Sequence, residues 1–117
     1  MRKLLLLVMA AALALSAADI TGRWAVSVDL SAGSGDADFV FEQQGEKLKG
    51  TYTGLLGKRE VTGTVKGDEV EFQFTGDANG QSVTAKFVGK VTAPGKMNGK
   101  ASYGDLAEGT FTARQLK

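Results

Sequence analysis

The chain has 117 residues, with 14 basic and 13 acidic side chains and neither cysteine nor histidine. This length makes one domain, and the balanced charge lacks the basic excess of a nucleic-acid-binding protein. The missing Cys and His remove disulfides, redox chemistry and the commonest catalytic bases and transition-metal ligands. We therefore expect a single non-enzymatic domain without a cofactor or a metal, which depends on its apolar core for stability.

Residues 1–18 are predicted to be an export signal. A basic start is followed by an apolar run from Leu4 to Leu15 and by the small residues Ser16–Ala18, an order typical of a cleaved leader. The run is shorter than the ~20 residues of a membrane span, so a retained anchor is the less favoured alternative. We expect cleavage after Ala18 and an exported monomer, periplasmic or extracellular, made of residues 19–117 and without a membrane span. Loss of Arg2 and Lys3 leaves 12 basic against 13 acidic side chains.

Eight segments of the mature chain alternate apolar and polar residues with the period of a β-strand, and none shows helical spacing over ten positions. The expected strands are Thr21–Leu30, Ala37–Gln44, Lys47–Gly54, Arg59–Lys66, Glu69–Thr75, Gln81–Thr92, Lys96–Tyr103 and Gly109–Leu116. Short connections between successive strands predict an antiparallel up-and-down meander.

The connections of such a meander alternate between its two ends. The longer ones meet at one end, which is the predicted mouth: Ser31–Asp36, Leu55–Lys58, Gly76–Gly80 and Gly104–Glu108. The other end has tight turns near Gly45, Gly67 and Pro94.

Glycines and aromatic residues predict that this meander closes on itself. A repeated motif (apolar, spacer, glycine, Thr or Lys, apolar or Ala) puts a glycine on the inner face of several strands, at Gly50, Gly63, Gly89, Gly99 and Gly109. Glycine within a strand marks a bend or a close backbone approach. All nine aromatic residues also fall on the inner face by strand parity, while Val40 and Val88 are the main apolar residues facing outward. We expect an all-β, eight-stranded closed barrel, with a two-sheet sandwich as the alternative.

The first and third predicted strands resemble a known family. Ile20-Thr21-Gly22-Arg23-Trp24 and Leu48-Lys49-Gly50-Thr51-Tyr52 look like the avidin pattern. More broadly, Gly22-x-Trp24 at the start of an eight-stranded meander resembles the calycin group of lipocalins, fatty-acid-binding proteins and avidins. The chain is also similar to small secreted bacterial β-barrel domains of unassigned activity. The resemblance implies that a basic residue of the last strand packs on the tryptophan in a cation–π pair, and Arg114 is the candidate, although strand parity places it outward.

The biotin site of avidins does not carry over to this chain. Val26 and Leu30 stand where avidins place polar contacts, Gly54 replaces the serine expected after Tyr52, and Trp24 has no further tryptophan to accompany it. We therefore do not expect a biotin binder.

One function hypothesis places a ligand inside the mouth half of the barrel. It predicts a small apolar or amphipathic molecule in a cavity of roughly several hundred Å³, lined by Leu30, Phe39, Tyr52, Phe74 and Tyr103. The alternative for the same residues is a filled core, because an eight-stranded barrel is barely wide enough for its own side chains.

A second hypothesis is a protein-interaction or enzyme-inhibitor barrel that acts through its loops. Its candidate residues are Leu55, Leu56, Lys58, Arg59 and Leu106, because leucines in loops can form an exposed apolar patch.

Two further ideas have little support. A carbohydrate face would need an outward aromatic residue, and the segments 36–38 and 77–80 lack the length and the closing Glu of a calcium loop.

Overall fold

The computed structural model describes residues 18–31, 33–78, 80–105 and 107–116, so most of the predicted signal peptide lies outside the described residues. Eight strands follow one another along the chain: β1 (Gly22–Leu30), β2 (Gly33–Gln44), β3 (Lys47–Gly54), β4 (Gly57–Lys66), β5 (Glu69–Ala78), β6 (Gln81–Ala93), β7 (Lys96–Tyr103) and β8 (Ala107–Gln115). Across these residues we find no helix that is long and apolar enough for a membrane crossing.

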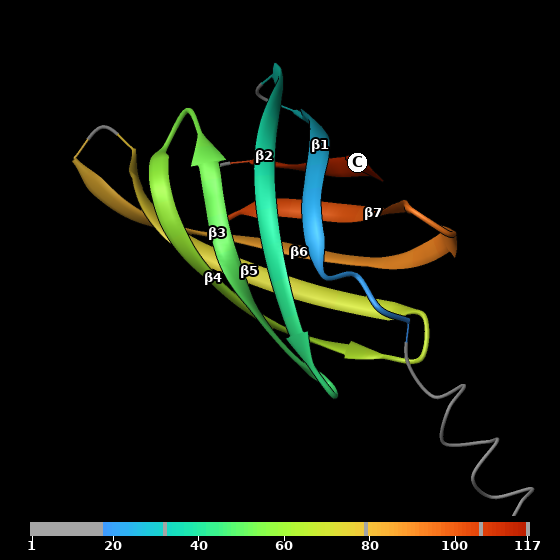
Figure 1. Ribbon diagram of the computed structural model, residues 1–117. Helices are drawn as coiled ribbons and strands as arrows, with labels where there is room; N and C mark the ends of the chain where they lie inside the picture. Colours follow the sequence, from blue (N-terminus) through green and yellow to red (C-terminus); the bar gives the residue numbers. More distant parts are fainter. Residues whose placement is uncertain (1–17, 32, 79, 106, 117) are drawn as a thin grey trace, which may run out of the picture.

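The strands form one closed antiparallel barrel (Figure 1). Each strand pairs with the next, and β1 also pairs with β8, from Trp24 opposite Gln115 to Leu30 opposite Gly109. The closure confirms the predicted all-β fold and excludes the two-sheet sandwich.

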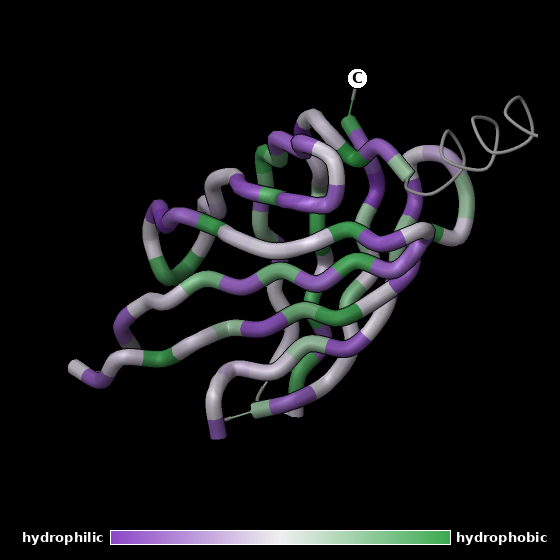
Figure 2. Tube along the Cα trace, turned by 90° about the horizontal axis from the view of Figure 1, so that it is seen from below, coloured by the Kyte–Doolittle hydropathy of each residue, from purple (hydrophilic) through white to green (hydrophobic). Residues whose placement is uncertain are grey.

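Hydrophobic and hydrophilic residues alternate along the strands (Figure 2). Eight of the nine aromatic residues are at most 2% exposed, and the ninth, Tyr103, is half-buried against the core. Val40 and Val88 are about half exposed on the outer face. The parity prediction is therefore confirmed, and the aromatic side chains form the core.

The five inward glycines lie where neighbouring strands approach closely. A Cβ added to any of them would overlap a backbone carbonyl oxygen of the adjacent strand, namely that of Val40, Glu71, Asn98, Val88 or Asp29 for Gly50, Gly63, Gly89, Gly99 and Gly109 respectively. Glycine thus lets the sheet coil tightly enough to surround a core of large rings.

The prediction of longer connections at one end was wrong. At each of these turns one of the two strands is longer than predicted (β2, β4, β5 and β8), so the connections at the predicted mouth are only residues 31–32, 55–56, 79–80 and 104–106. The segment Ser31–Asp36 reads as a loop because Gly, Ser and Asp favour turns, but Gly35 and Asp36 pair with Val28 and Ser27 of β1. Pairing with an established neighbouring strand outweighs local turn preference here. We keep the name mouth for the end with these four turns.

The segment before β1 covers the opposite end of the barrel. Ile20 is buried, its backbone N–H donates to Gln43 Oε1 (2.9 Å), and its carbonyl accepts a bond from Trp24 Nε1 (2.8 Å). Ala18 is bound on both sides, since its N–H donates to the Gly67 carbonyl (2.8 Å) and its carbonyl accepts from Gln43 Nε2 (2.7 Å). The predicted cleavage point between residues 18 and 19 therefore lies within a segment that is part of the fold.

Candidate binding site at the mouth of the barrel

The centre of the barrel is filled by aromatic rings. The ring of Phe39 lies 5.2–6.1 Å, centroid to centroid, from five others: Phe41, Tyr52, Phe72, Phe74 and Phe87. Phe39 and Phe74 are 0% and 2% exposed. The expectation that these two residues line a ligand cavity is corrected, because their rings pack against one another and against Tyr52 instead.

A cavity that is smaller than the predicted ligand site lies above this core, at the mouth. It is an open depression of about 250 Å³, which we call the mouth bowl, and its lining comes from β1, β2, β3, β7 and the β3–β4 turn. The lining residues are Val28, Leu30, Gly33, Ser34, Gly35, Asp36, Ala37, Tyr52, Leu55, Leu56 and Tyr103. Three of the five predicted ligand residues, Leu30, Tyr52 and Tyr103, belong to it. The wall is mostly apolar, and the two phenols supply polar groups at its base.

The hydroxyl of Tyr52 is positioned by its own turn. The backbone N–H of Leu56 donates to it at 3.2 Å, and a Cβ at Gly54 would come within 2.5 Å of the same oxygen. Glycine at position 54 therefore leaves the space that the hydroxyl occupies. Because the oxygen accepts the bond from Leu56, the phenolic O–H can donate to an acceptor in the bowl.

Tyr103 faces the bowl from β7. Burial, and to a lesser degree the neighbouring Tyr52, raises the pKa of Tyr103 to about 12. The Tyr103 phenol is therefore neutral at physiological pH and can act as a hydrogen-bond donor, but not as a general base.

The residues predicted as interaction loops separate into three groups. Leu55 is 91% exposed, whereas Leu56 is half-buried and packs on the core. Lys58 and Arg59 belong to β4 rather than to a loop, and Leu106 lies outside the described residues.

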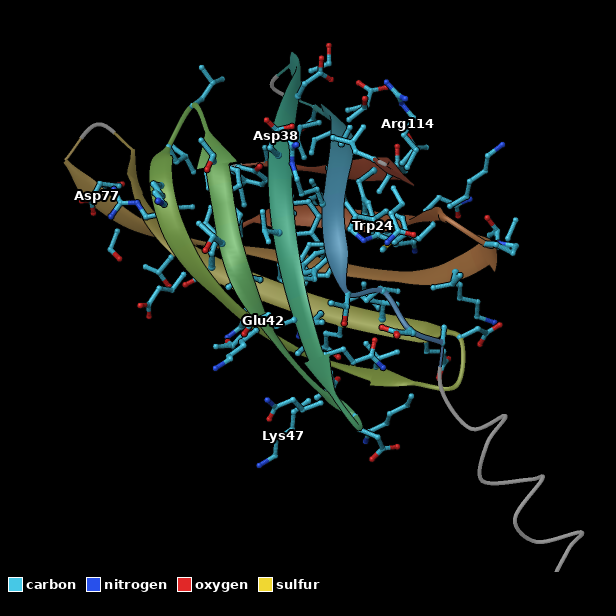
Figure 3. All side chains as sticks on the ribbon, viewed as in Figure 1. Trp24, Asp38, Glu42, Lys47, Asp77 and Arg114 are labelled. Atoms are coloured by element: carbon cyan, nitrogen blue, oxygen red, sulfur yellow. The ribbon has the colours of Figure 1, made fainter. Side chains whose placement is uncertain are left out.

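Arg59 is held at the mouth by two neighbours. Arg59 lies opposite Tyr52 in the pairing of β3 with β4. Its Nε donates to the Leu56 carbonyl (3.0 Å). Its Nη2 lies 3.9 Å from the carboxylate of Asp77, at the end of β5 (Figure 3). The guanidinium thus fixes the β3–β4 turn that carries Leu55 and Leu56.

Gly22 and Trp24 take structural positions, but Arg114 does not pack on the tryptophan. Trp24 is 1% exposed inside the barrel, while Arg114 is exposed on the outer face and lies opposite Ala25 (Figure 3). The next residue, Gln115, contacts the entry segment instead. Its Nε2 donates to the Thr21 carbonyl (2.9 Å), and it fills the space beside Gly22.

Sequence reasoning missed the roles of Gln43 and Gln115. Both glutamines continue the inward parity of an apolar strand, after Phe41 in β2 and after Ala113 in β8. A polar residue at an inward position near a strand end is the signal that could have identified them, because it must bond to whatever closes that end. Because residues 31–36 were predicted to be a loop, Ser34, Gly35 and Asp36 were not among the predicted ligand residues, although they line the bowl.

In the described part of the chain, no group of three or more carboxylates is arranged to hold a metal ion. Asp36 and Asp38 lie on the outer face of β2, and Asp77 pairs with Arg59.

Comparison with known proteins supports the fold alone. No protein-family model matches the chain, and no curated protein matches its sequence. Among solved structures, the chain is similar to a redesigned β-barrel, with a TM-score of 0.63 and 15% sequence identity over 84% of this chain and 92% of that one. The protein is therefore a small closed β-barrel, consistent with the calycin-like architecture.

Proposed function

We propose that the protein is an exported, non-enzymatic binding module whose mouth bowl takes the apolar part of a small amphipathic ligand. The observation that carries the proposal is the bowl itself: an apolar depression with two phenols, directly above a solid core. Cavities that combine apolar walls with a few polar groups are the usual form of small-molecule sites.

The size of the bowl limits the ligand. A 150 Å³ apolar cavity is enough for benzene, so about 250 Å³ suits an apolar group of roughly ten non-hydrogen atoms, with the rest of the ligand in solvent. At roughly 0.5 kcal/mol per non-hydrogen atom, such a group would contribute about 5 kcal/mol, a Kd near ~0.2 mM. A tighter natural ligand would have to make further contacts on the rim.

Two features of the sequence support the remaining parts of the proposal. The leader pattern of residues 1–18 supports export. The lack of His and Cys, together with phenols that serve as donors, supports binding without catalysis.

Titration with octan-1-ol, followed by amide NMR spectra, tests the proposal. Saturable shifts are expected at Leu30, Tyr52 and Tyr103. Leu30→Ser is expected to weaken binding about tenfold, because it puts a hydroxyl into the apolar wall. Val88→Ser on the outer face is the matched control and should leave the affinity unchanged. Shifts that are absent, or that are the same in Leu30→Ser as in the unaltered protein, would contradict the proposal.

A protein partner is a second candidate, favoured by Leu55. Its exposed fraction of 91% is about twice that of Val40 and Val88, the other large exposed hydrophobic residues of the described part. Leu55 lines the bowl together with Leu30 and Leu56, and contiguous apolar surface of this kind marks interaction sites. Native mass spectrometry of the protein purified from its own host separates the two candidates. A protein-sized adduct that is lost in Leu55→Ser supports a partner, and a small-molecule adduct supports the first proposal.

A further inference from the structure

We infer that the ligand of the mouth bowl is an organic cation, an apolar chain that carries a protonated amine. This inference rests on the proposed function and specifies the chemical class of its ligand. The bowl has mostly apolar walls with two phenols at its base. Among the described residues that line it, the one charged residue is Asp36, which lies on the outer face of β2 at the rim. A ligand seated in the bowl would therefore extend its polar end toward a rim that carries this carboxylate.

The rim around Asp36 is acidic as well. Asp29 and Glu108 lie on the outer face at the mouth ends of β1 and β8, and Asp105 lies in the turn that follows Tyr103. The backbone N–H of Ser31 donates to the Glu108 carbonyl at 3.0 Å, so the β1–β2 turn lies directly beside the start of β8. This side of the mouth thus carries four carboxylates on its outer rim.

None of these four carboxylates takes part in an ion pair of the described residues. Those ion pairs join Glu42 to Lys49, Asp77 to Arg59, and Glu71 to Lys86. Asp36 lies opposite Ser27, and Asp29 lies opposite Ser34 and Thr110, which are neutral neighbours.

Two basic residues, Lys58 and Arg59, lie on the other side of the mouth, and Lys100 lies on the outer face of β7, opposite Thr110. Lys58 and Arg59 both belong to β4, and Arg59 is already engaged by the Asp77 carboxylate and the Leu56 carbonyl. Charge is therefore unevenly distributed around the mouth, negative over β1, β2 and β8. A cationic head group is attracted to that side, whereas an anionic one is repelled.

Three probes with the same eight-carbon chain test the inference: octylammonium, octan-1-ol and octanoate, each titrated into the full barrel at low ionic strength. We expect octylammonium to bind about five times more tightly than octan-1-ol, and octanoate to bind more weakly than both. About 0.5 M NaCl should remove most of the difference, because it screens exposed charges, while the affinity for octan-1-ol should stay the same.

Asp36→Asn is expected to reduce the affinity for octylammonium about threefold and to leave that for octan-1-ol unchanged. Asp38→Asn is the matched control. Asp38 lies two residues further along the outer face of β2 (Figure 3) and does not line the bowl. Asp38→Asn should therefore change the affinity for octylammonium less than half as much as Asp36→Asn does.

The outcomes separate this inference from the proposed function. If octan-1-ol binds as well as octylammonium, or octanoate binds best, the cation inference is overturned and the binding site stands. If the preference for octylammonium survives both high salt and Asp36→Asn, the carboxylates are not its cause and the inference is also overturned. If none of the three probes binds, the proposed function itself fails.

Discussion

The ring of Tyr52 stacks on that of Phe74, with centroids 4.0 Å apart and planes inclined by 16°. This contact separates the two regions of the barrel interior. Below it the rings of Phe39, Phe72 and Phe87 pack on one another, and above it Tyr52 and the half-buried Tyr103 line the mouth bowl. Stability and the proposed ligand binding can therefore be tested with different substitutions.

The aromatic core should dominate the stability of the barrel. Phe39→Ala removes a fully buried ring that contacts five others, and we expect it to lower the free energy of unfolding by about 3–5 kcal/mol. Val88→Ala, on the outer face, should change it by less than about 0.5 kcal/mol. Urea unfolding measures both values. A loss below about 1 kcal/mol for Phe39→Ala would mean that the ring is not at the centre of the core.

The inward glycines should not tolerate a side chain. Gly50→Ala places a methyl group against the carbonyl oxygen of Val40, so the two strands must separate, and we expect a loss of at least ~2 kcal/mol. Gly35→Ala in β2 is the matched control, because its methyl group would meet only the flexible end of Leu55, at 3.9 Å. Denaturant titration of both variants gives the comparison, and equal losses would show that close strand approach is not the reason for glycine at position 50.

Gln43 should contribute to stability by binding the entry segment. Gln43→Ala leaves the Ile20 N–H, which the mature chain retains, without its acceptor, which we expect to cost about 1–3 kcal/mol. The adjacent Gln44 is exposed, so Gln44→Ala should cost less than about 0.5 kcal/mol. Thermal and urea unfolding test this pair. If both variants unfold alike, the segment before β1 does not depend on the Gln43 side chain.

The pKa of Tyr103 predicts a loss of stability in alkali. Its pKa is about 12 in the folded protein against 10.0 for the free side chain. Between these values the unfolded chain releases the proton while the folded barrel keeps it, so stability falls as the pH rises from about 10 to about 12. Below about pH 10 both states are protonated and this contribution is constant.

Unfolding measured across this pH range, for the unaltered protein and Tyr103→Phe, isolates the contribution of Tyr103. The decline should be shallower in Tyr103→Phe, since other groups that titrate in alkali are the same in both proteins. Parallel curves for the two proteins would show that Tyr103 titrates normally.

The fold was predictable because its signals are local and repeated. Alternation defines each strand face, and glycines at the positions of Gly50 and Gly109 require curvature that a closed barrel provides. The extent of the strands was not predictable from composition, because Gly33–Asp36 becomes a strand only through pairing with β1.

The site was less predictable than the fold. Parity placed Tyr52 and Phe74 on the inner face in the mouth half, but whether two such rings stack or enclose a cavity depends on packing at the scale of one methyl group. Arg114 was the family-based candidate for the contact with Trp24. Strand alternation predicted that Arg114 lies on the outer face, and the structure confirms this position.

Intermolecular NOEs between octan-1-ol and the isotope-labelled barrel would locate the bound alkyl chain. We expect contacts from the chain to the side chains of Leu30, Leu56 and Tyr103, and none to Phe39, which is fully buried. Contacts to Phe39 would show that the core opens to take the ligand, and contacts confined to Val40 or Val88 would show that the mouth bowl is not the binding site.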